Sequence, residues 1–157
     1  MFAPKKILIP TDFSECDGHC SMFAIKQAVD ISKQHGSELV FLHVITEDIY
    51  KKPVFFLTEE NIEGLKDKMQ EFYEEKLDHL IEEYAPGQKD RCSKIVKEGK
   101  PYHEILNEAE NNVDLIVIAT RGLSGIQNVF YGSVTEKVVR HAKCSVLVVR
   151  KLLNDKS

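Results

Sequence analysis

The segment TRGLSGIQNVFYGSVTEKVV, residues 120–139, contains the residue types that most clearly suggest binding chemistry. Gly122 and Gly125 follow an apolar run, and Gly132 is followed by Ser133. Glycines ahead of a helix can let backbone N–H groups surround a phosphate. Glycines also serve simply to turn a chain, so spacing alone leaves both interpretations open.

The residues after Gly132 predict the start of a helix that would assist phosphate binding. Ser133 and Glu136 match the capping box S-x-x-E, with Ser133 as the N-cap. The first N–H groups of this helix would carry partial positive charge, and the hydroxyls of Ser133 and Thr135 could donate to a phosphate. The alternative is that Ser133 only caps the helix and Gly132 only turns the chain. Neither a Walker loop nor a Rossmann glycine fingerprint occurs in the sequence.

Strand and helix patterns alternate along the chain. Continuous apolar runs predict strands at 7–9, 37–45 and 114–120, and a weaker pattern at 92–96 and the segment 145–151 predict two more. Apolar residues at helical spacing predict four helices, at 14–35, 59–84, 101–112 and 134–142. Residues 46–58 show no clear period and carry Tyr50, Phe55 and Phe56. We expect this segment to form a loop that sets individual specificity.

This order predicts one α/β domain over residues 1–157, with three layers: a five-stranded parallel sheet and helices on both faces. In such sheets ligands lie beyond the carboxyl ends of the strands, where the winding reverses. If the first strand lies beside the fourth, Asp12 faces the loop that starts at Thr120. A carboxylate there could accept hydrogen bonds from ribose hydroxyls while the loop binds phosphates.

Composition narrows the classes of partner. The net charge is −4 and no basic cluster occurs, so we expect neither nucleic acid nor an anionic membrane as a partner. No apolar run approaches the roughly 20 residues that span a bilayer, and no long apolar leader is present, so we expect a cytoplasmic location.

The four cysteines should be free thiols in the cytoplasm. The cluster CDGHC, from Cys16 to Cys20, lacks a second ligand pair, which favours a helix start over a metal site.

Several segments together resemble the universal stress protein family, and the resemblance covers nearly the whole chain. They are KKILIPTDFSE, FLHVI, EGKPYHEIL and IVIATRGLSGIQNVFYGSVTEKVVRHAKCSVLVVR. The family's nucleotide-binding pattern is G-x2-G-x9-G-[ST]. Gly122, Gly132 and Ser133 match its last three fixed positions, whereas Ala119 stands where the pattern has its first glycine. If that position needs a positive φ, alanine costs about 1 kcal/mol; if it allows close approach of a ligand, one methyl group could still fit.

The resemblance implies a sheet order of 3-2-1-4-5 and a site for ATP, with Mg²⁺ accompanying the nucleotide. By resemblance, Asp12 would contact the ribose, and the backbone around Pro10 and Val44 would border the adenine. The phosphates would be held by Gly122, Gly132, Ser133, Val134 and Thr135. The expected site also includes the adjoining residues Thr11, Ala119, Thr120 and Arg121, the last of which could instead be a solvated loop arginine.

The residues favour nucleotide binding over turnover. No general base is placed to activate a water, because His103 and His141 have surface positions and His43 lies inside an apolar strand. The resemblance implies a stress-response regulator that forms a homodimer through the strand Ser145 to Lys151 and acts on an unidentified signalling partner. A dimeric interaction module without a nucleotide is the alternative that Ala119 favours. An adenine-nucleotide α-hydrolase is a third, although its SGGxDS signature is replaced here by PTDFSE.

Overall fold

The computed structural model describes residues 1–13, 20–47, 58–120 and 132–150. Within these residues strands and helices alternate as predicted. The strands are β1 (Lys6–Pro10), β2 (Glu38–Ile45), β3 (Cys92–Glu98), β4 (Leu115–Ala119) and β5 (Ser145–Val149). The α-helices are α1 (Cys20–His35), α2 (Glu59–Tyr84), α3 (Pro101–Ala109) and α4 (Ser133–His141), and a 3-10 helix, η2 (Pro86–Arg91), precedes β3.

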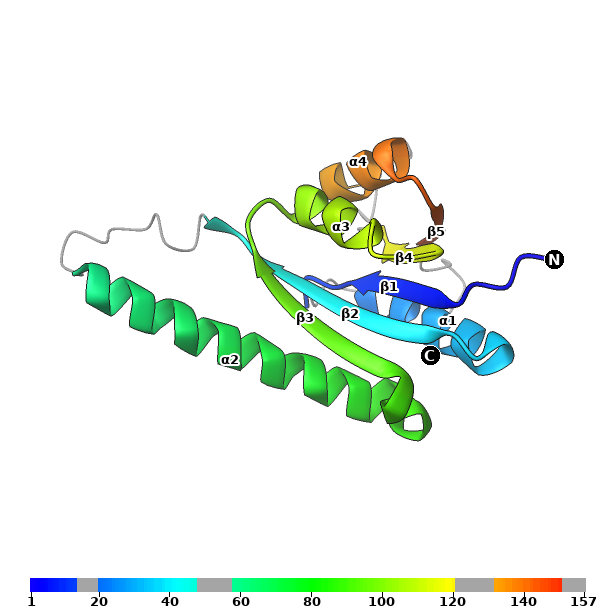
Figure 1. Ribbon diagram of the computed structural model, residues 1–157, viewed down its shortest axis with the longest axis horizontal. Helices are drawn as coiled ribbons and strands as arrows, with labels where there is room; N and C mark the ends of the chain where they lie inside the picture. Colours follow the sequence, from blue (N-terminus) through cyan, green and yellow to red (C-terminus); the bar gives the residue numbers. More distant parts are fainter. Residues whose placement is uncertain (14–19, 48–57, 121–131, 151–157) are drawn as a thin grey trace.

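The strands form one parallel sheet in the order β3-β2-β1-β4-β5, which confirms the order that the resemblance implied (Figure 1). The winding therefore reverses at β1, between its neighbours β2 and β4. Two predicted segments extend beyond the described residues. Residues 14–19 of the predicted helix 14–35 and residues 48–57 of the predicted loop 46–58 lie outside the described part.

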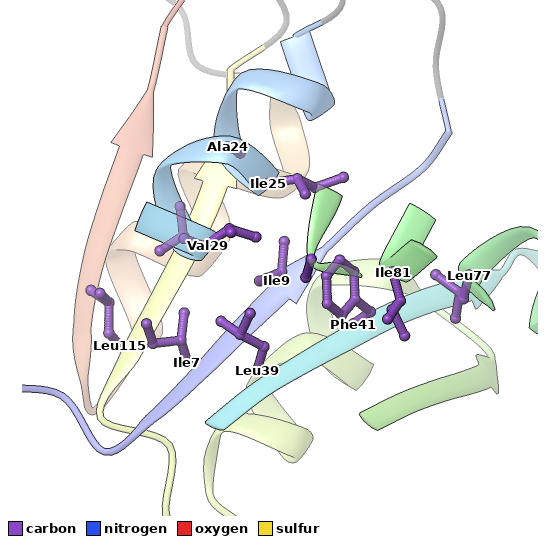
Figure 2. Packing of buried hydrophobic residues seen from close by; sticks show 13 residues of the cluster. Ile7, Ile9, Ala24, Ile25, Val29, Leu39, Phe41, Leu77, Ile81 and Leu115 are labelled. Carbon is purple, nitrogen blue, oxygen red and sulfur yellow. The ribbon is translucent and has the colours of Figure 1, made fainter. Parts of the chain in front are cut away.

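The strands β1, β2 and β4 are buried on both faces of the sheet, which explains why their sequences are continuously apolar. Alternate β1 residues point to opposite faces: Ile7 and Ile9 pack with the residues of α1 and α2, whereas Leu8 packs with those of α3 and α4. Figure 2 shows the first of these clusters, in which Ile25 of α1 and Leu77 of α2 lie over the same sheet face. The three-layer arrangement is thus confirmed.

The sheet separates at its carboxyl edge between β1 and β4. The β1–β4 register covers only Ile7 with Leu115 and Leu8 with Ile116, whereas β1 stays paired with β2 as far as Pro10. Thr11 N–H donates to Leu42 O of β2 at 2.9 Å. Because N–H directions alternate along a strand, the position of Pro10 faces β4, and proline has no N–H to donate there. Pro10 thus ends the ladder where the winding reverses.

Local sequence explains where the longest helix begins and ends. The hydroxyl oxygen of Thr58 accepts from Asn61 N–H and caps α2, and Pro86 follows soon after its last residue. The bounds of α2 agree with the predicted range 59–84. In the described residues no helix is both long enough and apolar enough to cross a membrane.

We predict that Leu77→Ala lowers the free energy of unfolding by about 2–5 kcal/mol, because it leaves a cavity in the core. Leu77 is fully buried, whereas Leu65 on the same helix is 40% exposed. Leu65→Ala is therefore the matched control and should cost less than about 1 kcal/mol. Urea unfolding of both variants measures the difference. Equal losses would mean that α2 does not pack on the sheet through Leu77.

Candidate functional site

A pocket of about 410 Å³ opens at the carboxyl edge of the sheet. Its walls come from β1, β2 and β4 and the residues that follow them, from the N-termini of α1, α3 and α4, and from one residue of α2. The lining residues are Pro10, Thr11, Asp12, Ser21, Leu42, His43, Val44, Ile45, Thr46, Tyr73, Pro101, Ile105, Ile118, Ala119, Thr120, Gly132, Ser133, Val134 and Thr135. The separation of β1 from β4 lies at the centre of this wall.

The structure brings together all the predicted site residues that it describes. Those from the first turn and the strand ends are Pro10, Thr11, Asp12, Val44, Ala119 and Thr120; those from the start of α4 are Gly132, Ser133, Val134 and Thr135. Arg121 and Gly122 lie outside the described residues. The predicted site residues that the structure describes line one shared pocket, while their contacts with a ligand stay a prediction.

Sequence reasoning did not assign Ser21, Tyr73, Pro101 or Ile105 to the site. Pro101 and Ile105 could have been found, because α3 follows the carboxyl end of β3 and so starts at the same edge of the sheet. Tyr73 lies in the middle of α2 and reaches the pocket only because of how that helix packs. No local pattern in the sequence signals such a residue.

The start of α4 differs from the predicted capping box. Gly132, not Ser133, is the N-cap, and no side chain caps the helix; Ser133 is its first residue. The carboxylate of Glu136 accepts from Arg140 at 2.8 Å instead of returning to the helix start. The first intrahelical bond runs from Glu136 N–H to Gly132 O at 3.0 Å, so the preceding N–H groups have no partner within the helix.

The Thr135 hydroxyl is predicted to donate to a phosphate, whereas in the structure it donates to a backbone carbonyl. Thr135 is buried, and its Oγ1 donates to Ala119 O at 3.1 Å. This bond ties the first turn of α4 to the end of β4. The Thr135 side chain therefore fixes the helix start in the pocket wall.

Ala119 adopts ordinary strand geometry. It is the last residue of β4 and pairs with Val149 of β5. Among the described residues other than glycine, only Phe13 and Asn112 have a positive φ. Alanine therefore carries no left-handed backbone strain at this position, and only its methyl group distinguishes the site from one with glycine.

The turn after β1 is held by a buried histidine. Thr11 O accepts a hydrogen bond from Nδ1 of His43 at 2.8 Å, which places the proton of the neutral ring on Nδ1. Burial lowers the pKa of His43 below its usual 6.5, although the Thr11 bond and the charge of Asp12 act in the opposite direction. The expectation of a packed histidine with a hydrogen-bond partner is confirmed.

Other candidate reactive groups lie away from the pocket or outside the described residues. His103 and His141 are exposed on α3 and α4. Cys92 and Cys144 are free and half-buried, and burial raises the pKa of both thiols, which lowers their reactivity at neutral pH. Cys16 and the side chain of Cys20 lie outside the described part, in which no group of three potential metal ligands occurs.

We predict that the free energy of unfolding falls as the pH drops below about 6.5, because the unfolded chain binds a proton at His43 more readily than the folded protein does. Above that pH the His43 ring is neutral in both the folded and the unfolded protein, so its full contribution to stability is present. Urea unfolding between about pH 8 and 5 measures the slope, which His43→Gln should flatten. Leu65→Ala, at an exposed position, changes no titratable group and is the control, which should keep the wild-type slope. If His43→Gln leaves the slope unchanged, the pH dependence of stability does not come from His43.

Comparisons with known proteins agree with this fold. The model of the universal stress protein family matches residues 4–150. The universal stress protein MJ0577 of Methanocaldococcus jannaschii is 33% identical over 94% of this chain and 95% of its own length. The solved structure of MJ0577 has a TM-score of 0.74 at 31% identity and covers 98% of this chain and 100% of that one.

A more distant solved structure extends the comparison of folds. It is a universal stress protein in complex with cAMP, with a TM-score of 0.60 at 20% identity, and the match covers 95% of this chain and 98% of that one. At this identity the likeness concerns the fold alone. With the family match spanning almost every residue from the first strand to the last, the chain belongs to the universal stress protein family.

Proposed function

We propose that the pocket binds an adenine nucleotide, ATP with Mg²⁺, and that the protein acts as a dimeric, cytoplasmic regulator in the stress response. The observation that carries this proposal is the uncapped N-terminus of α4, which opens into the pocket. N–H groups without a helical partner and the positive end of the helix together favour a phosphate.

The rest of the pocket suits the other parts of a nucleotide. Asp12 is an exposed carboxylate on the pocket wall and can accept from ribose hydroxyls. The apolar side chains that could pack against a flat base are Leu42, Val44, Ile105 and Ile118. The universal stress protein solved in complex with cAMP supports the idea that this fold can hold an adenine nucleotide.

A magnesium ion fits this site only as a companion of the phosphates. Among the described lining residues Asp12 is the only carboxylate. Mg²⁺ prefers octahedral oxygen ligands and keeps several waters, so phosphate oxygens and waters would supply most of them. When bound, the ion neutralises phosphate charge.

We expect hydrolysis to be slow at most. Catalysis of phosphoryl transfer needs a group that orients the attacking water and groups that stabilise the developing charge. Of the described lining residues, His43 is committed to Thr11 through Nδ1, and Asp12 is assigned to the ribose. A binding protein whose state depends on its nucleotide suits a regulator better than an enzyme.

The outer edge of β5 supports the proposed homodimer. β5 ends the sheet, and in the described residues its only strand partner is β4. Leu147 in this strand is 36% exposed. An open apolar edge strand exposes unpaired backbone groups, and pairing with the same strand of a second copy would satisfy them.

We predict saturable binding of Mg·ATP by refolded protein in calorimetric titration, since refolding removes any nucleotide retained during purification. Ala119→Gly should change the dissociation constant by less than about tenfold, because Ala119 has no positive φ to relieve. Binding only by the glycine variant would mean that one methyl group closes the site and would favour the interaction module. Release of AMP and pyrophosphate during incubation would favour the α-hydrolase.

We predict a dimer in sedimentation velocity, and its dissociation by Leu147→Lys, which places a charge on the β5 edge. Leu65→Lys is the matched control, because Leu65 is similarly exposed, at 40% against 36% for Leu147, but lies on α2. The control should remain dimeric. A monomeric wild type, or a dimer that survives Leu147→Lys, would contradict assembly through β5.

A further inference from the structure

Phe13, which directly follows Asp12, has a backbone conformation that bulky residues rarely adopt. Its φ is 55°, in the left-handed region. For a residue other than glycine this costs about 1–2 kcal/mol, and such strain persists only where surrounding contacts impose it. Strained residues of this kind are concentrated at ligand sites, so the contacts that hold Phe13 indicate what the turn is for.

An aromatic cluster of three side chains, Phe13, His43 and Tyr73, holds this conformation. The ring centroid of Phe13 lies 4.7 Å from that of His43 and 5.8 Å from that of Tyr73, and the rings of His43 and Tyr73 lie 4.1 Å apart. Lys76 Nζ of α2 lies 5.0 Å from the Phe13 ring centroid, a cation–π distance. The cluster therefore joins the first turn, β2 and α2.

Hydrogen bonds fix the same turn from both sides of Asp12. Thr11 N–H donates to Leu42 O at 2.9 Å, and Thr11 O accepts from His43 Nδ1 at 2.8 Å. Phe13 N–H donates to Thr11 Oγ1 at 3.2 Å. Thr11 and His43 are buried while Asp12 is exposed on the pocket wall. Hydrogen bonds thus hold the residues on either side of Asp12, and Asp12 itself lines the cavity.

We propose that the aromatic cluster is a positioning device for Asp12, and that it sets the preference of the pocket for ligands that carry the vicinal hydroxyls of ribose. This inference rests on the proposed function and extends it from nucleotide binding to sugar selectivity. Phe13 and Tyr73 are positioning residues that act through Asp12. A carboxylate bound to two hydroxyls needs a defined position, because a displacement of about 1 Å breaks a hydrogen bond.

The test is calorimetric titration with Mg·ATP and with Mg·2′,3′-dideoxy-ATP, which lacks both hydroxyls. The wild type should bind ATP at least about tenfold more tightly, because hydrogen bonds to a charged group are strong. Asp12→Asn should bring this ratio close to one. Phe13→Ala and Tyr73→Ala should also lower the ratio, by at least about threefold. For Phe13→Ala, whose side chain does not line the pocket, the affinity for dideoxy-ATP should stay within about twofold of the wild-type value.

Matched variants separate positioning from a general structural role. Tyr73→Phe keeps the ring and should retain the wild-type ratio, and Leu65→Ala, on the exposed side of the same helix, should do so as well. If Phe13→Ala fails to fold, Phe13→Leu keeps apolar bulk without a flat ring and should lower the ratio similarly. A role limited to packing α2 against the sheet would leave the ratio unchanged in every cluster variant.

The outcomes distinguish this inference from the proposed function. No binding of either nucleotide by the wild type would overturn both. Tight binding of both nucleotides with equal affinity would leave nucleotide binding intact and overturn the inference. A ratio that Asp12→Asn abolishes but Phe13→Ala and Tyr73→Ala leave unchanged would likewise overturn it.

Discussion

The separation of β1 from β4 is the constraint on which the rest of the site depends. Their ladder ends at Leu8 and Ile116, because Pro10 offers no N–H toward β4. The chain winds in opposite directions from β1, which leaves a crevice at the carboxyl edge of the sheet. The strand ends and the starts of α3 and α4 meet there, and Tyr73 reaches it from the middle of α2.

Two turns at the gap are held by buried side chains rather than by local backbone pattern. Thr135 fixes the start of α4 to Ala119 O, and His43 fixes the turn after β1 to Thr11 O. Each bond gives a hydrogen-bond donor to a backbone carbonyl at or just beyond the end of a strand. The start of α4 and Asp12 thus line the same cavity.

Apolar runs and helical periods predict the strands and helices, because buried parallel strands are continuously apolar and helices show their period. The order of the strands and several pocket residues, Val44 among them, are instead implied by the family resemblance. It gives the wrong cap for α4: Ser133 and Glu136 match a capping box, but Gly132 takes the cap and Glu136 pairs with Arg140. Tyr73 was not predicted either, because its place in the pocket depends on how α2 packs, which no local pattern records.

The most direct test of the central claim, that a nucleotide binds at this gap, is a ¹H–¹⁵N correlation titration of refolded protein with Mg·ATP. The largest shifts are expected for the backbone amides of Asp12, Thr120 and Val134, which line the pocket from three different elements. Leu106 and Lys143, which line a separate cavity, should shift little. Shifts confined to that second cavity, or no shifts at saturating nucleotide, would contradict the account.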